Sequence, residues 1–127
     1  MTTPLPIKRS NESIEIGLIQ GIRPDSINES WFGLACERLK LDYNYQVPIG
    51  TIGARGSQWV DYVVYSPFAY ACFIQGSYWH SARTETEDRL KHAAAERVFG
   101  AGRVVDFSEE ETASLDAAIR SIRRKLL

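Results

Sequence analysis

The apolar run Trp59–Tyr65 constrains this chain most, because a single carboxylate stands in the middle of it. Its β-branched and aromatic residues are typical of a strand. Since side chains alternate along a strand, Asp61 shares a face with Trp59 and Val63, and the opposite face is apolar as well. A carboxylate placed among apolar side chains is costly unless it is paired or binds a cation. The run therefore predicts a strand and makes Asp61 a candidate site residue.

The segments before this run predict a helix and then a strand. Ser26 and Glu29 have the spacing of a capping box, and apolar residues recur at helical intervals over 27–41. The segment 43–50 has strand character, and the glycine-rich stretch 50–57 suits a hairpin turn. We therefore expect a helix followed by a strand that pairs with the run containing Asp61.

The segments after this run alternate between strands and helices. We expect a strand at 69–74, a helix at 85–99 that ends at Gly100, and a short strand at 103–107. Ser108 has capping-box spacing to Glu111, which predicts the start of a last helix there. The apolar residues of that helix fall on one stripe: Leu115, Ile119, Ile122 and Leu126. This order of elements predicts an α/β sandwich around a mixed sheet.

The length of 127 residues fits one domain. Residues 1–25 contain three prolines and little periodicity, so we interpret them as an N-terminal arm and 26–127 as a single α/β domain. An arm of this kind is ordered by the body of the domain or by a partner, which favours a homo-oligomer or larger assembly.

The charge balance argues against a protein covered in basic surface. The formal net charge is −1 and the isoelectric point is about 6.1, whereas nucleic-acid-binding proteins usually carry a basic excess. Charge can nevertheless segregate onto one face. The sequence shows no signal peptide and no apolar segment of membrane-spanning length. We therefore expect no membrane partner and a cytoplasmic location.

Polar residues stand on two neighbouring predicted strands. Asp61 is in the middle of one, and Gln75 and His80 follow the end of the next. Metal-dependent cleavage of a phosphodiester needs oxygen ligands for Mg²⁺ and a group that activates water. The spacing alone is equally compatible with an aspartate that caps a loop and a structural histidine.

The segment 73–80, FIQGSYWH, resembles the corresponding segment of the very short patch repair endonucleases, where an aspartate stands about a dozen residues upstream, as Asp61 does here. Glu87–Asp88–Arg89 matches the acidic–arginine pair that begins a later helix in that family. The resemblance covers roughly 30–107. It implies a restriction-endonuclease-like three-layer sandwich, with a mixed central sheet flanked by helices.

The resemblance also implies roles for individual residues. Asp61 would be the side-chain ligand of Mg²⁺ or Mn²⁺, and the backbone carbonyl of Ile74 a second ligand. His80 would be the general base, and Gln75 stands where that family has a further histidine. Glu37, on the first predicted helix, is a candidate acid that orients metal-bound water. The Glu-x-Lys pair of the wider superfamily is absent, as it is in the patch repair family.

Contacts to DNA are expected from the residues around His80. Tyr78 and Trp79 would occupy the aromatic pair that the family wedges into the DNA stack. Arg83 is a candidate phosphate contact, although a scattered solvated surface explains it equally well. The zinc-binding cysteines and histidines of the patch repair family have no counterpart here.

Three functions remain open at this point. The first is a metal-dependent DNA endonuclease of the very short patch repair type; the resemblance is compatible with a divergent, phage-encoded member of that family. The second is a non-catalytic structural or assembly component, for example of a phage virion, built on a degenerate nuclease-like fold. The third is a nucleic-acid-binding module that has kept the fold without the chemistry.

Overall fold

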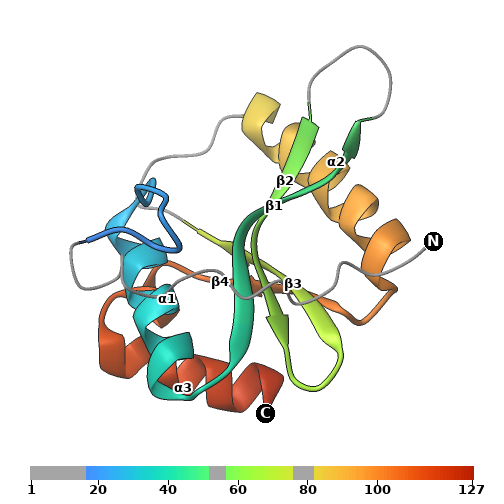
Figure 1. The fold of residues 1–127 in the computed structure, drawn as a ribbon. Helices are drawn as coiled ribbons and strands as arrows, with labels where there is room; N and C mark the ends of the chain where they lie inside the picture. The colour runs from blue at the N-terminus through green and yellow to red at the C-terminus, as the bar shows by residue number, and fades with distance from the viewer. Residues whose placement is uncertain (1–16, 52–56, 76–81) are drawn as a thin grey trace.

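The computed structural model describes residues 17–51, 57–75 and 82–127 (Figure 1). These residues form one four-stranded mixed sheet and three α-helices. The elements in chain order are α1 (Ile27–Arg38), β1 (Asp42–Thr51), β2 (Ser57–Tyr65), β3 (Ala69–Ile74), α2 (Ala82–Phe99), β4 (Val104–Phe107), the 3₁₀ helix η2 (Glu110–Thr112) and α3 (Leu115–Leu126). The strands lie in the order β1-β2-β3-β4, with the first three antiparallel and β4 parallel to β3. The α/β class and the mixed sheet predicted from the sequence are confirmed.

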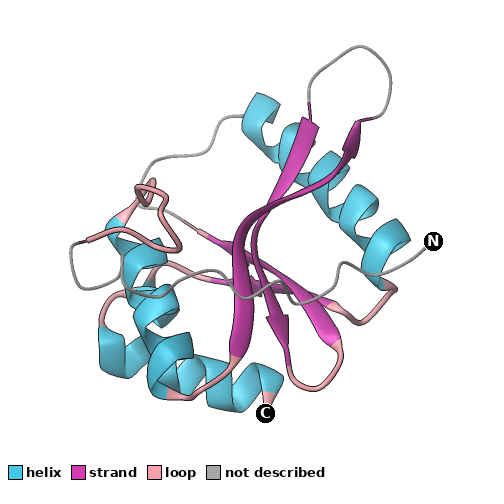
Figure 2. Cartoon of the chain, in the orientation of Figure 1, coloured by secondary structure: helices cyan, strands magenta, loops and turns pink. Residues whose placement is uncertain are grey.

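The helices cover both faces of this sheet. Helices α1 and α3 lie on one face and α2 on the other (Figures 1 and 2). Phe32 and Ile122 pack against Tyr62 and Val64 in the core beneath α1 and α3. The second core contains Val63 and, from the other elements, Val47, Ala71, Phe73, Ala95 and Phe99. The alternation predicted for β2 is confirmed at Tyr62, Val63 and Val64, which face the two cores in turn. The prediction that Val60 shares the face of Tyr62 is wrong, because Val60 packs in the second core with Val63.

The ends of α1 and α2 follow from their caps. The hydroxyl of Ser26 accepts a hydrogen bond from the Glu29 N–H at 3.2 Å, which confirms the predicted start of α1. The helix ends at Arg38 rather than at 41, because Lys40 adopts a left-handed conformation with φ +57°. Gly100, with φ +102°, ends α2 as predicted, and its N–H donates to the carbonyl of Glu96.

The predicted start of the last helix is wrong. Ser108 and Glu111 do form a reciprocal capping box, since the N–H of Ser108 donates to Glu111 Oε1 and the N–H of Glu111 donates to Ser108 Oγ. This box lies at the start of η2 and not at the start of α3. Helix α3 begins at Leu115, where the hydroxyl of Ser114 accepts from the N–H of Ala117 at 3.1 Å.

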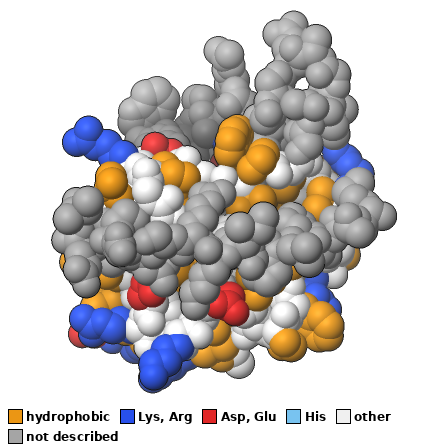
Figure 3. Space-filling model, in the orientation of Figure 1, with side chains coloured by type: hydrophobic (Ala, Val, Ile, Leu, Met, Phe, Trp, Pro, Cys, Tyr) orange, Lys and Arg blue, Asp and Glu red, His pale blue; other side chains and the backbone are white. Residues whose placement is uncertain are grey.

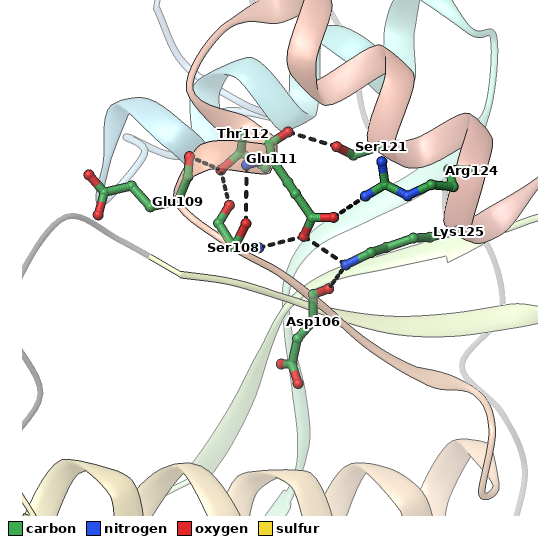
Figure 4. A network of polar contacts seen from close by, with 8 residues as sticks. All are labelled: Asp106, Ser108, Glu109, Glu111, Thr112, Ser121, Arg124 and Lys125. Atoms are coloured by element: carbon green, nitrogen blue, oxygen red, sulfur yellow. Dashed lines mark hydrogen bonds and ion pairs between the residues drawn. The ribbon is translucent and has the colours of Figure 1, made fainter.

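Polar contacts join η2 to the C-terminal end of α3 (Figure 4). Glu111 Oε1 accepts from Lys125 Nζ at 2.7 Å, and Glu111 Oε2 pairs with Arg124. Lys125 also donates to the backbone carbonyl of Asp106 in β4. Burial acts to raise the pKa of Glu111, but hydrogen bonds from Lys125 and Ser108 hold it below its usual value. The basic end of α3 therefore fastens this helix to the sheet.

Residues 17–25, the last nine residues of the predicted arm, lie against the domain. The side chain of Gln20 donates to the carbonyl of Tyr43 and accepts from the N–H of Tyr45, both at 2.8 Å. Ile19 is buried in the core under α1. Residues 1–16 lie outside the described residues. No helix in the described part of the chain is long and apolar enough to cross a membrane.

The hairpin of β1 and β2 extends beyond β3. The β2–β3 pairing runs from Tyr65↔Ala69 to Tyr62↔Cys72, whereas β1 and β2 remain paired as far as Thr51↔Ser57. Figure 1 shows this extended part of the hairpin beside α2. The two strands thus diverge from β3 immediately before Tyr62, which is where Asp61 stands.

Candidate functional site

Asp61 occupies the point where β2 diverges from β3. Its Oδ2 accepts a hydrogen bond from the backbone N–H of Ile74 at 2.8 Å. In a continuous ladder a backbone carbonyl of the neighbouring strand would accept such a bond. The carboxylate therefore completes the pairing of β3 at its last residue. Among the described residues, Ile74 is the one that donates to the carboxylate of Asp61.

A cavity of about 380 Å³ opens at Asp61, and three parts of the chain line it. Asp25 comes from the segment before α1, Gln46 and Trp59 from the hairpin, and Lys91 from α2. Trp59 and Asp61, two residues apart on β2, both line this cavity. The cavity thus combines two carboxylates, an ammonium, an amide and an indole.

Asp61 is poised between its two protonation states near neutral pH. Its burial raises the pKa to about 7. The negative charges of Glu29 and Asp25 act in the same direction, while the N–H of Ile74 and the charge of Lys91 oppose them. A cation bound in this cavity would favour the ionised carboxylate for the same electrostatic reason.

The acid of α1 whose charge raises the pKa of Asp61 is Glu29, and not the predicted Glu37. Glu29 is buried, accepts from the hydroxyl of Tyr45 at 2.5 Å, and has a pKa raised by desolvation. Glu37 stands eight residues further along α1, which is about 12 Å along the helix axis, and accepts from the hydroxyl of Tyr43. The structure therefore does not bring Glu37 into the cavity. The capping-box pattern had accounted for Glu29 as a helix start only.

Gln46 is strained where it stands beside Asp61. It lies between the pairs Tyr45↔Tyr62 and Val47↔Val60, so it faces Asp61 across the hairpin. Its φ of +52° is in the left-handed region, which is uncommon for a residue other than glycine. Its side-chain amide donates to Asp25 Oδ2 at 3.1 Å. Such backbone conformations persist where the surrounding contacts impose them, often at functional sites.

Gln75 lies in a different cavity from Asp61. This second cavity, of about 470 Å³, lies between α2 and the ends of β3 and β4; its lining includes Gln75, Asp88, Arg89, His92, Glu96 and Asp106. His92 Nε2 lies 2.8 Å from Asp106 Oδ1, and its ring stacks on Phe73 with centroids 4.8 Å apart. The predicted grouping of Gln75 with Asp61 is therefore not seen.

Several predicted site residues lie outside the described residues. These are Tyr78, Trp79 and His80, so the aromatic pair and the general base stay predictions. Arg83 belongs to the first turn of α2, but its side chain is outside the described part of the structure. The two predicted metal ligands, the Asp61 carboxylate and the carbonyl of Ile74, belong to residues that are in contact. The contact is made by the N–H of Ile74, so the role of its carbonyl stays a prediction.

The described residues contain no group of three or more histidine, cysteine, aspartate or glutamate side chains that could hold a metal ion. They do place two carboxylates, Asp25 and Asp61, on one cavity. Mg²⁺ commonly binds one or two carboxylates and completes its shell with water and substrate phosphate oxygens. The donor set therefore fits a Mg²⁺ ion held jointly with a phosphate, and does not fit a preformed cage.

The basic side chains on the face drawn in Figure 3 are spread around its edge, at the lower left, the upper left and the right. Among the described residues that line the cavity at Asp61, Lys91 is the basic one. Of these residues, it is therefore Lys91 that offers positive charge to a phosphate.

Comparison of the chain with models of protein families, with curated proteins and with solved structures found no match.

Proposed function

We propose that this protein is a metal-dependent DNA endonuclease with a restriction-endonuclease-like fold, and that Asp61 is the centre of its active site. One observation carries the proposal. A half-buried carboxylate with a pKa of about 7 stands where two strands diverge, in a cavity that it shares with a second carboxylate and an ammonium. Perturbed acids in cavities are frequent at catalytic sites. The mixed sheet with helices on both faces, and the resemblance of FIQGSYWH to the patch repair endonucleases, support the same class.

The residues of the cavity divide the work of phosphodiester hydrolysis. Asp61 and Asp25 would hold the metal ion, which when bound lowers the pKa of water and polarises the phosphate. The N–H of Ile74 fixes the orientation of the Asp61 carboxylate. Lys91 stabilises negative charge on the phosphate oxygens. His80 remains the proposed base that takes the proton of the attacking water.

The second candidate is a non-catalytic component of an assembly. The hydrogen bond from Ile74 favours it, because this bond gives Asp61 a structural role without any chemistry. The two candidates differ in what a replacement of Asp61 does to cleavage and to folding.

The test is cleavage of supercoiled plasmid with Mg²⁺ or Mn²⁺. Asp61→Asn keeps an oxygen for the N–H of Ile74 but removes the negative charge. We expect metal-dependent nicking by the unaltered protein and a loss of about 100-fold or more in the variant, as is typical when a group that acts on the reaction is removed. Asp116→Asn, an exposed position in the first turn of α3, is the matched control and should cleave normally. Cleavage by Asp61→Asn at the normal rate would show that Asp61 is not in the active site. No cleavage by the folded protein with either metal would favour the assembly component.

A further inference from the structure

We propose that the cavity at Asp61 accepts an unpaired nucleobase stacked on Trp59, so that the substrate is single-stranded or locally unpaired DNA. This inference rests on the proposed endonuclease function and specifies its substrate. Trp59 lines the cavity and is 48% exposed. A large aromatic surface is thus available within a concave site beside the candidate catalytic carboxylate.

The position of Trp59 in the fold keeps this surface accessible. Trp59 pairs with Pro48 of β1, in the part of the hairpin that extends beyond β3. The strand β3 therefore does not flank this part of β2. Stacking on tryptophan, tyrosine or phenylalanine is the usual way in which proteins hold unpaired bases, because every base has a flat π face.

The other groups of the cavity suit the remainder of a nucleotide. Lys91 can contact a phosphate. The Gln46 amide nitrogen already donates to Asp25 and to the Tyr45 hydroxyl, so this side chain offers its amide oxygen as an acceptor for a base edge. The volume of about 380 Å³ lies within the range of roughly 300–1,000 Å³ that small-ligand sites occupy. The two carboxylates outnumber the ammonium, so a phosphate should enter only together with a divalent cation.

The need for an unpaired base follows from the shape of the duplex. A base inside a duplex has both faces covered by its neighbours, so it must leave the stack before it can lie on an indole. Single-stranded or mismatched DNA requires less energy for this step. The geometry therefore points to preference for unpaired DNA and not for a sequence in intact duplex.

Binding of fluorescently labelled oligonucleotides tests the inference independently of cleavage. Single-stranded and duplex forms of one sequence are titrated with the full chain in Ca²⁺, which also takes oxygen ligands, and again in EDTA. We expect tighter binding of the single strand in Ca²⁺ and a loss of about tenfold or more for Trp59→Ala. Trp59→Phe should retain most of the affinity. Phe68→Ala removes an exposed aromatic ring from the β2–β3 turn and should leave the affinity for both oligonucleotides unchanged.

Each outcome distinguishes this inference from the proposed function. Equal single-strand affinity of Trp59→Ala and the unaltered protein, or tighter binding of the duplex, would overturn the inference even if Asp61-dependent cleavage is observed. Single-strand binding that depends on Trp59 without any cleavage would support base stacking and refute the endonuclease. Failure to bind either oligonucleotide would refute both.

Discussion

Asp61 shows how one residue can have a structural and a chemical role together. Its carboxylate completes the backbone pairing of β3 through the N–H of Ile74. The same position raises its pKa from 3.8 to about 7, mainly because ionisation is unfavourable in a buried site. A folded protein that retains such a group gives up stability at neutral pH, which is a common feature of functional sites.

The sign of this effect on stability can be measured. Because the folded-state pKa lies above the unfolded value, the contribution of Asp61 to stability is fully present below pH 4 and is lost as the pH rises through 7. Asp61→Asn is neutral at every pH, so we expect it to unfold with similar free energy at pH 4 and to be more stable by about 2–4 kcal/mol at pH 8. Urea denaturation of both proteins at the two pH values measures this. An equal difference at both pH values would show that Asp61 ionises normally in the fold.

At the scale of elements, two capping signals lie within seven residues of each other and serve different turns. Ser108 and Glu111 hydrogen-bond to each other at the start of η2, whereas Ser114 caps α3. Thr112, between the two caps, is buried, and its hydroxyl donates to the carbonyl of Ser108. The chain therefore makes a separate turn before the long helix begins.

Replacing the two serines separates their effects. Ser114→Ala should destabilise the protein by about 1 kcal/mol, the usual cost of losing an N-cap, and should speed amide exchange in the first turn of α3. Ser108→Ala should instead speed exchange in η2 and leave the first turn of α3 protected. Hydrogen exchange measured residue by residue distinguishes them. Faster exchange at the start of α3 in Ser108→Ala would show that the capping box supports this helix after all.

At the scale of the whole molecule, the distance between α1 and the sheet depends on a glycine. A Cβ added to Gly33 would lie 2.6 Å from the hydroxyl oxygen of Tyr62 and 3.3 Å from Cδ1 of Ile19. That hydroxyl donates to the carbonyl of Glu29 at 2.6 Å, so it cannot simply turn away. The close approach of the two layers also brings Glu29 within electrostatic reach of Asp61.

This contact predicts a coupling between two mutations. Gly33→Ala should destabilise the protein by about 1–3 kcal/mol through overpacking, although alanine is the better helix former. In the Tyr62→Phe background the obstructing hydroxyl is gone, so Gly33→Ala should become nearly neutral or stabilising. A double-mutant cycle from urea denaturation measures the coupling. Additive costs would show that the hydroxyl does not limit the approach of α1.

The sequence by itself determined the elements and most of their limits, because those signals are local. The run around Asp61, the cap at Ser26 and the stop at Gly100 act through neighbouring residues, and the structure has β2, the start of α1 and the end of α2 at those positions. From the order of these elements the α/β class and the mixed sheet followed. Asp61 could be predicted as a site residue for a similar reason, since a carboxylate within an apolar run can be recognised from the sequence alone.

Only the tertiary structure decided which residues share a cavity with Asp61. Asp25 and Lys91 lie far from it in sequence and carry no local pattern that distinguishes them from solvated charges. Gln75, close in sequence, belongs to another cavity because it lies between α2 and the end of β4. Strand divergence and the packing of α1 and α2 on opposite faces are long-range effects, and a local pattern encodes neither. The site is therefore a property of how the layers meet.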